Sequence, residues 1–154
     1  EMLIRPATLA DARKLAQLYA LVWSKEVEAL GEKMARERAA KASEIRRWIK
    51  ADCYFVIELE GILVAVLGCE ERRGTFHLVH LVVHPEHRRK GYARMLMKHA
   101  ETLARESGAA KLWFDTAPGL KAARILYDSL GYTQCGYLHK HYWGMDVVLY
   151  EKLL

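Results

Sequence analysis

A cluster of basic side chains stands directly before a glycine in the middle of the chain. Arg88, Arg89 and Lys90 precede Gly91, and the small residue Ala93 follows. The cluster comes after a strand-like run and at the beginning of a helix-like one. The first turn of a helix has unpaired backbone N–H groups and a partial positive charge, and a glycine lets a ligand approach the backbone closely. These features predict a binding site for a pyrophosphate.

A simpler interpretation of the same cluster is a basic helix start that is only solvated. Cations at a helix N-terminus oppose the helix dipole, at a cost of about a few tenths of a kcal/mol each. Three of them are unfavourable there without an anion, which favours the phosphate interpretation. The spacing matches neither GxGxxG nor GxxxxGK[ST], so neither a Rossmann site nor a P-loop is predicted.

Apolar periodicity predicts the elements that position this turn. A strand over Thr75–Val83 stops near Pro85, a helix covers Gly91–Ser107, and a second strand covers Lys111–Thr116. Two strands joined through a helix usually lie parallel. The hairpins predicted on either side imply antiparallel pairs elsewhere in the sheet.

The whole chain is therefore expected to form one α/β (α+β) domain over residues 1–154. Its central sheet should be mixed and mostly antiparallel, with helices on both faces. The other predicted strands are Met2–Arg5, Cys53–Leu59, Ile62–Cys69, Tyr132–Leu138 and Asp146–Lys152, and the other predicted helices are Ala12–Trp23, Gly31–Lys50 and Leu120–Leu130.

Composition limits the classes of partner. The formal net charge is +5, which suits anionic ligands. The basic cluster is compact and Gly91 interrupts it, so it fits one phosphate site better than a nucleic-acid track, and no nucleic acid is expected as a partner. No apolar run is long enough to cross a bilayer, and residues at the start of the sequence lack the apolar h-region of a signal peptide. We therefore expect a cytoplasmic protein with no membrane partner.

The cysteines and histidines, which often bind metals, have a spacing that predicts no metal site here. The cysteines Cys53, Cys69 and Cys135 are odd in number and far apart, so each is expected to be a small buried apolar residue. No HExxH motif is present. The central histidines fall on opposite faces of a strand or in the turn after it, which makes them poor chelators; they are His77, His80, His84 and His87.

The turn also resembles the signature of a known family. Arg88-x-x-Gly91-x-Ala93, preceded by Val83-x-Pro85, is similar to the (Q/R)xxGx(G/A) motif of the GNAT acetyltransferases, and the order of elements is similar over nearly the whole chain. The resemblance implies the GNAT acyl-CoA N-acyltransferase fold and acetyl-CoA as co-substrate, without a metal. It implies that the turn binds the pyrophosphate, with Arg88, Arg89, Lys90, Gly91, Tyr92 and Ala93 as cofactor-binding residues.

A second segment supports the resemblance. Ala122–Tyr132 is similar to the family's A-x-x-(F/Y)-Y-E-x-x-G-(F/Y) segment. The resemblance implies that Tyr127 lies near the thiol of coenzyme A and donates a proton to it, and a tyrosine hydroxyl is protonated at neutral pH. The family often has an asparagine seven residues earlier. This chain has Leu120 there, which puts one polar contact with the cofactor in doubt.

The resemblance also implies that the strand Thr75–Val83 splays from the next one and that its backbone pairs with the pantetheine arm. This makes Leu81, Val82 and Val83 cofactor-binding through their backbones, while their side chains remain in the core. His80, on the same strand, is a candidate catalytic base because histidine titrates near neutrality. The alternatives are a water relay or one of the carboxylates Glu70, Glu71 and Asp115.

The implied activity is direct acetyl transfer to a primary amine, which can belong to a small molecule, an amino acid, an antibiotic or a peptide or protein. The alternatives are an acyl-CoA sensor of the same fold without turnover, a transferase of another acyl group, and, from charge alone, a nucleic-acid-binding protein. Homodimers are common in the family. The resemblance implies an acceptor pocket formed by the loop between the first two helices and by the last hairpin, which here hold Trp23, Glu26, Glu28, His139, His141, Tyr142 and Trp143.

Overall fold

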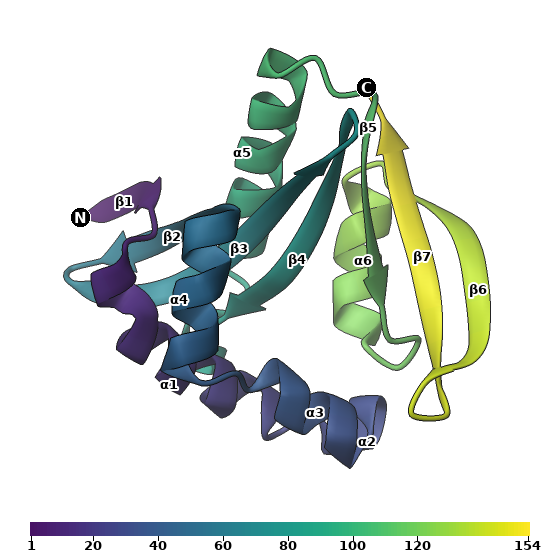
Figure 1. The fold of residues 1–154 in the computed structure, drawn as a ribbon, viewed down its shortest axis with the longest axis horizontal. Helices are drawn as coiled ribbons and strands as arrows, with labels where there is room; N and C mark the ends of the chain where they lie inside the picture. Colours follow the sequence, from purple (N-terminus) through teal and green to yellow (C-terminus); the bar gives the residue numbers. More distant parts are fainter.

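The structure is a computed structural model that describes residues 1–154, and it contains one seven-stranded sheet with helices on both faces (Figure 1). The strand order is β1-β2-β3-β4-β5-β7-β6, and only β4 and β5 run parallel. The predicted mixed, mostly antiparallel sheet is therefore confirmed. The strands are β1 Met2–Pro6, β2 Cys53–Leu59, β3 Ile62–Arg72, β4 Thr75–Val83, β5 Lys111–Thr116, β6 Thr133–Tyr142 and β7 Met145–Leu153.

Two apolar cores lie on opposite faces of this sheet. The helices α5 and α6 cover one face, and α1, α2, α3 and α4 gather on the other. Alternation along the strands divides the side chains between the cores, because successive residues of a strand point to opposite faces. In β2, Phe55 and Ile57 join the first core and Tyr54 and Val56 join the second. The helices are α1 Ala12–Trp23, α2 Val27–Leu30, α3 Glu32–Arg38, α4 Ala42–Ala51, α5 Tyr92–Glu106 and α6 Lys121–Ser129.

The parallel strands β4 and β5 pair only over their first three residues. Thr75–His77 lies beside Lys111–Trp113, after which β4 stays paired with β3 and β5 stays paired with β7. The strands diverge from that point, as the ribbon shows (Figure 1). The edge of β4 from Leu78 to Val83 therefore has no neighbouring strand on the β5 side.

A β-bulge interrupts β4 on this unpaired stretch. Val79 lies opposite Gly68 and Val82 lies opposite Val66, so two residues of β4, His80 and Leu81, face one residue of β3. His80 has φ +58°, in the left-handed region that non-glycine residues rarely adopt. Bulges re-aim side chains and are frequent beside active sites.

The single helix predicted over Gly31–Lys50 is wrong, because the structure breaks this segment into α3 and α4 and adds a short α2 before them. Ala39 leaves the helical region with ψ +64°, and Ala40 is buried in the core of the α1 face. The carboxylate of Glu44 then accepts a hydrogen bond from Lys41 N at 3.3 Å, which caps a new helix. The break lets both short helices reach the core.

The prediction for the cysteines is correct for one of three. Cys69 is buried, whereas Cys53 and Cys135 are exposed. Cys53 is the first residue of β2 and Cys135 lies on the edge strand β6, where a side chain has few neighbours. None of the helices combines the length and apolar character that crossing a bilayer requires.

Candidate active site

The basic turn lies between the end of β4 and the start of α5. A short 3-10 helix, Pro85–His87, leads into it, and Arg89 and Gly91 both have positive φ, at +62° and +80°. Such a turn exposes successive backbone N–H groups on one side, as anion-binding turns do. A Cβ placed on Gly91 would meet no atom within 4 Å, so the space beside its backbone is open.

The three cations of the turn have no counterion within the protein. Arg88, Arg89 and Lys90 are exposed, and none forms an ion pair. Nδ1 of His87, at the entrance of the turn, is the one enclosed side-chain N or O atom without a hydrogen-bond partner. Free positive charge, open backbone and an unpartnered polar atom make this turn fit the pyrophosphate of coenzyme A.

The tyrosine of the second motif lies on α6 and faces the sheet. Tyr127 packs against the rings of Phe114 and Tyr150, with centroids 4.4 and 5.7 Å away. Its side chain is buried, yet its hydroxyl has no hydrogen-bond partner in the protein and is not fully enclosed. Burial raises the pKa of Tyr127 to about 12, although the charge of Arg38 opposes this. The hydroxyl therefore holds its proton at neutral pH.

Two arginines hold α6 against its neighbours. Arg94 of α5 donates from Nη2 to the Ser129 hydroxyl at 2.8 Å. Arg124 of α6 donates from Nε to the Tyr150 hydroxyl at 3.1 Å, and also bonds the Pro118 carbonyl oxygen at 3.1 Å. These contacts connect α6 to the helix that begins at the basic turn and to β7, so the positions of Tyr127 and of the turn are linked.

The bulge residue His80 lies in an aromatic stack on the α1 face of the sheet. Its ring lies 3.8 Å from the Trp48 ring and nearly parallel to it. Its Nδ1 is hydrogen-bonded to the Tyr54 hydroxyl at 2.6 Å, and its carbonyl oxygen accepts from the Tyr19 hydroxyl at 2.8 Å. Burial, with a smaller effect of Arg38, lowers the pKa of His80 to about 4. The imidazole is therefore neutral at pH 7 and a weak base.

A charged pair lies across the divergence of β4 and β5. Arg38, at the end of α3, places its guanidinium 5.1 Å from the centre of the Trp23 ring. Its Nη2 lies 3.8 Å from Oδ1 of Asp115 on β5, and the other carboxylate oxygen of Asp115 accepts a hydrogen bond from the Tyr142 hydroxyl at 3.3 Å. The sequence predicts Trp23 and Tyr142 near the acceptor, and Asp115 as an alternative catalytic base. Sequence reasoning missed Arg38, because it stands in a charged helix beside the similar Arg36.

The other predicted acceptor-side and base residues lie elsewhere. Glu70 is hydrogen-bonded to Nδ1 of His77 at 2.7 Å and to Arg72 at 3.1 Å, at the end of β4 that still pairs with β5. Glu71 is exposed at the same end. Glu28, His139 and His141 are also exposed, and the ring of His141 lies 4.5 Å from that of Tyr142.

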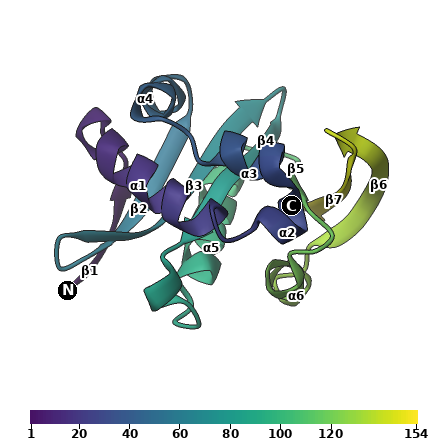
Figure 2. The same ribbon diagram turned by 90° about the horizontal axis from the view of Figure 1, so that it is seen from below.

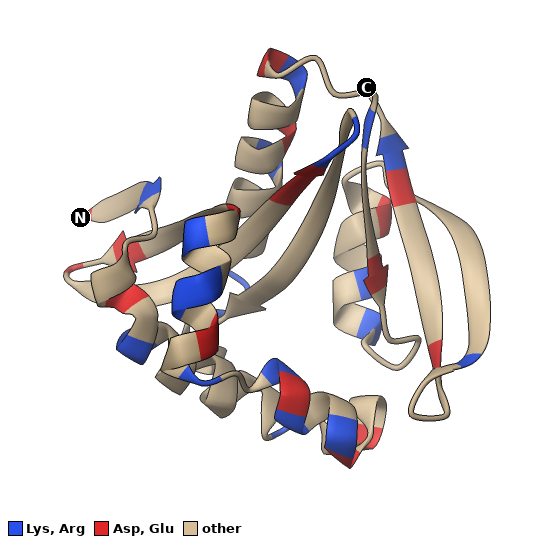
Figure 3. Cartoon of the chain, viewed as in Figure 1, with Lys and Arg blue, Asp and Glu red and all other residues tan.

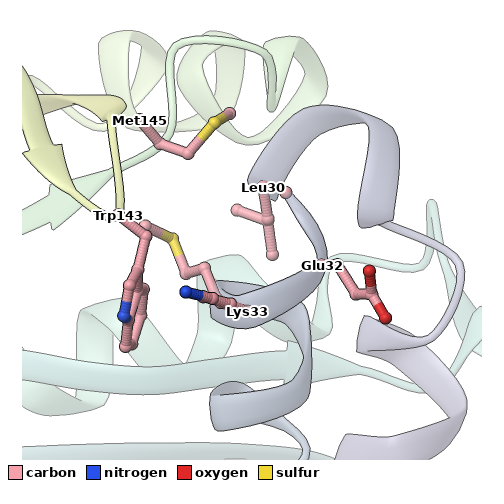
Figure 4. Close-up of a pocket in the computed structure, with 7 residues that line it drawn as sticks. Leu30, Glu32, Lys33, Trp143 and Met145 are labelled. Atoms are coloured by element: carbon pink, nitrogen blue, oxygen red, sulfur yellow. The ribbon is translucent and has the colours of Figure 1, made fainter.

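A surface pocket of about 420 Å³ lies where the α2–α3 segment meets the turn between β6 and β7 (Figure 4). Trp143 and Met145 come from the hairpin, and Leu30 and Lys33 come from the helical segment. The pocket includes neither the basic turn nor Tyr127. It shows that the two elements expected to form the acceptor side contact each other. No three side chains among His, Cys, Asp and Glu gather as a metal ion would require.

Comparisons with known proteins agree with the fold and the motifs. The model of the acetyltransferase (GNAT) family matches residues 15–132, which is well over half of the chain. The chain therefore belongs to the acetyltransferase (GNAT) family. It is 30% identical to human N-acetyltransferase 8 over 107 residues, which cover 66% of this chain and 47% of that protein.

Two further comparisons extend the similarity to bacterial proteins. The chain is 40% identical to streptothricin acetyltransferase of Streptomyces lavendulae over 69 residues, which cover 45% of this chain and 32% of that protein. It spans about half the length of human N-acetyltransferase 8 and less of streptothricin acetyltransferase. A ribosomal-protein-alanine N-acetyltransferase structure from Brucella melitensis is 25% identical with a TM-score of 0.80, covering 99% of both chains.

An N-acetyltransferase from Thermoplasma acidophilum, solved in complex with coenzyme A, has a TM-score of 0.84 at 15% identity and covers 100% of this chain and 99% of that one. At this identity the likeness shows the fold alone. The fold is therefore one that holds coenzyme A in a solved structure.

Proposed function

We propose that this chain is an N-acetyltransferase that moves the acetyl group of acetyl-CoA to a primary amine by direct attack in a ternary complex. One observation carries the proposal: the unpaired edge of β4 leads straight into a basic turn whose cations have no partner in the protein. An extended ligand can pair with the strand edge while its phosphates meet the turn. Family membership supports the same interpretation.

Two groups of residues would bind different parts of the co-substrate. Arg88, Arg89 and Lys90, with the backbone N–H groups from Gly91 to Ala93, would hold the pyrophosphate. The backbone of Leu81–Val83 would hold the pantetheine arm. Acetyl-CoA supplies an acetyl thioester, and transfer forms one N–C bond and breaks one C–S bond while the amine loses a proton and the thiolate gains one.

Tyr127 is the proposed proton donor to the departing thiolate. Its hydroxyl keeps its proton at neutral pH and has no internal partner to compete for it. Holding the amine and the thioester together converts a bimolecular step into an effectively unimolecular one. The protein then needs only to supply this proton and accept the one that the amine releases.

The proposed role of His80 changes from base to positioning residue. Its imidazole is packed against Trp48 and bonded to Tyr54, and its lowered pKa makes it a poor acceptor for the proton of an amine. The Tyr19 hydroxyl holds the carbonyl of the same residue. These contacts fix the bulge, and with it the direction of the β4 edge that receives the co-substrate.

Acetyl-CoA binding tests the proposal through heat-induced unfolding of the protein with the ligand titrated in. A ligand that binds only the folded state stabilises it by about 2.7 kcal/mol at a hundredfold excess over Kd. We expect a saturating increase in Tm that weakens in Arg88→Ala/Arg89→Ala. The matched control is Arg46→Ala/Arg47→Ala, which removes the same charge from exposed positions on α4 and should keep the full shift. No shift at millimolar acetyl-CoA would overturn the assignment.

A further inference from the structure

We propose that the acceptor amine carries a carboxylate and that Arg38 binds it, so that the substrates are free amino acids or small conjugates that keep an amino acid's amine and carboxylate. This inference rests on the proposed function, because it names the substrate class of the same site. Its starting observation is a mostly buried guanidinium at the acceptor side that forms one long ion pair and no hydrogen bond within the protein.

Arg38 is far less exposed than its neighbour on the same helix. Its side chain is 23% exposed, whereas that of Arg36 is 76% exposed. It reaches inward from the end of α3 and lies over the indole of Trp23. In Figures 1 and 2 the α2–α3 segment extends from α1 toward the β6–β7 hairpin, across the end of the sheet where β4 and β5 diverge. The guanidinium connects this segment with α1 through Trp23 and with β5 through Asp115.

The N–H donors of Arg38 make no hydrogen bond to the protein, and its ion pair with Asp115 is long at 3.8 Å. The other partly buried arginines are bonded. Arg5, with a side chain 25% exposed, holds both oxygens of Asp11 at 2.8 and 2.9 Å, and Arg124 bonds Tyr150 and a carbonyl oxygen. An arginine stays charged at neutral pH and its planar fork matches a carboxylate. The nitrogens of Arg38 are not fully enclosed, so a ligand can reach them.

The position of Arg38 relates it to the proposed reaction centre. Its charge acts on the hydroxyl of Tyr127, which lies on α6, and on the ring of His80, which lies on β4. These two residues stand on either side of the divergence. A carboxylate on Arg38, beside Asp115 of β5, would therefore lie on the side of this divergence where the amine is expected to meet the thioester.

Asp115 completes the match to such a molecule. Its carboxylate lies beside the guanidinium and is oriented by the Tyr142 hydroxyl. A cation and an anion side by side complement a zwitterion, whose carboxylate would face Arg38 and whose ammonium would face Asp115. The aromatic rings of Trp23 and Tyr142 contact the same pair, Trp23 at the guanidinium and Tyr142 at the carboxylate. A polyamine or a protein N-terminus has no carboxylate beside its amine and would leave Arg38 unpaired.

The test measures thiol release from acetyl-CoA with matched acceptors. The panel holds the standard L-amino acids, their carboxamides and their decarboxylated amines, together with a polyamine and short peptides. We expect turnover with at least one amino acid, and a kcat/KM for its carboxamide and its amine lower by about a hundredfold, the range for breaking a hydrogen-bonded charge pair. Carboxylate-free amines that react as well as their amino acids, or turnover of peptides or the polyamine alone, would overturn the inference.

Variants of the arginine separate binding from folding. In Arg38→Gln we expect the KM for the preferred amino acid to rise about a hundredfold, with acetyl-CoA still raising Tm as in the wild type. Arg38→Lys should recover part of the loss because it keeps the charge, and the exposed control Arg36→Gln should change neither value. An unchanged KM in Arg38→Gln would contradict the inference. If acetyl-CoA binds nowhere, the proposed function itself fails and the inference fails with it.

Discussion

Burial raises the pKa of Tyr127 and lowers the pKa of His80. A buried tyrosine resists losing its proton and a buried histidine resists gaining one, because a low-dielectric environment disfavours the charged form of each. Tyr127 therefore remains a proton donor with a pKa of about 12, and His80 becomes a weak base with a pKa of about 4. The sequence motif predicts Tyr127 as an acid, while no pattern in the sequence reveals the stack around His80.

Removing the Tyr127 hydroxyl should affect chemistry and leave folding almost unchanged. In Tyr127→Phe we expect kcat to fall by about ten- to a thousand-fold, the range for general acid catalysis. The free energy of unfolding should change little, because this hydroxyl has no protein partner. The measurements are steady-state kinetics and urea unfolding.

The matched control for that variant is Tyr132→Phe, whose hydroxyl donates to Oε2 of the buried Glu101 at 3.2 Å. We expect the opposite pattern in the control, with lower stability and kcat near the wild-type value. A wild-type kcat in Tyr127→Phe would remove Tyr127 from the mechanism.

The lowered pKa of His80 predicts a loss of stability in acid. The unfolded chain, with a histidine pKa of 6.5, binds a proton more readily than the folded protein with its pKa of about 4. Stability therefore falls as pH falls from 6.5 toward 4, and this residue accounts for about 2 kcal/mol between pH 7.5 and 5. Urea unfolding at the two pH values measures the loss.

The control for this prediction is His80→Asn, because asparagine tolerates positive φ better than most residues. The variant should lose about 2 kcal/mol less than the wild type over the same pH interval. Equal losses in the two proteins would show that His80 is not held in the neutral form. A pH–rate profile of the variant parallel to that of the wild type would support its positioning role.

At the scale of elements, the strands near the site and the first helix, α1, follow their sequence pattern, and the segment from Gly31 to Lys50 does not. The predicted bounds of β4 and β5 match the structure, because apolar alternation and Pro85 mark them clearly. The segment from Gly31 to Lys50 contains neither proline nor an internal glycine to mark a break, and its break depends on the burial of Ala40 in the folded core. Arg38 is the last residue of α3 before this break, so its position depends on a feature that the sequence pattern does not reveal.

A buried ion pair joins α5, β7 and the end of α6. Lys152 donates to Oε1 of Glu101 at 2.8 Å and to the carbonyl oxygen of Leu130 at 2.8 Å, and Glu101 is only 5% exposed. Lys152→Met leaves the Glu101 carboxylate buried without its main partner. We expect a loss of about 3 kcal/mol in the free energy of unfolding, measured in urea.

The matched control for the ion pair is Lys111→Met, which breaks a pair of the same length, 2.8 Å, with Glu151 on the surface of the neighbouring strands. This loss should stay below about 1 kcal/mol, because these side chains are 35% and 28% exposed and water screens the pair more than it screens Glu101. Similar losses in the two variants would contradict the importance of the buried network.

At the scale of the whole molecule, the sheet is continuous but its two halves separate where the site lies. The core on the α5 and α6 face still joins the two halves, because it includes buried residues of β2, β3 and β4 as well as of β5 and β7. Basic and acidic residues are interspersed over α3, α4 and the strands (Figure 3). The residues that give the net charge of +5 are therefore distributed over many elements. Three cations stand side by side in the turn before α5, at Arg88, Arg89 and Lys90.

The measurement that tests the central claim most directly is the rate of thiol release from acetyl-CoA, with the concentrations of acetyl-CoA and of an amine acceptor varied together. Direct transfer in a ternary complex predicts release that requires the amine, an N-acetylated product in equal amount, and intersecting lines in a double-reciprocal plot. Acetyl-CoA binding without amine-dependent release would contradict the account and make the protein a sensor. Parallel lines would indicate that the acetyl group is first transferred to the protein itself, and this would contradict direct attack.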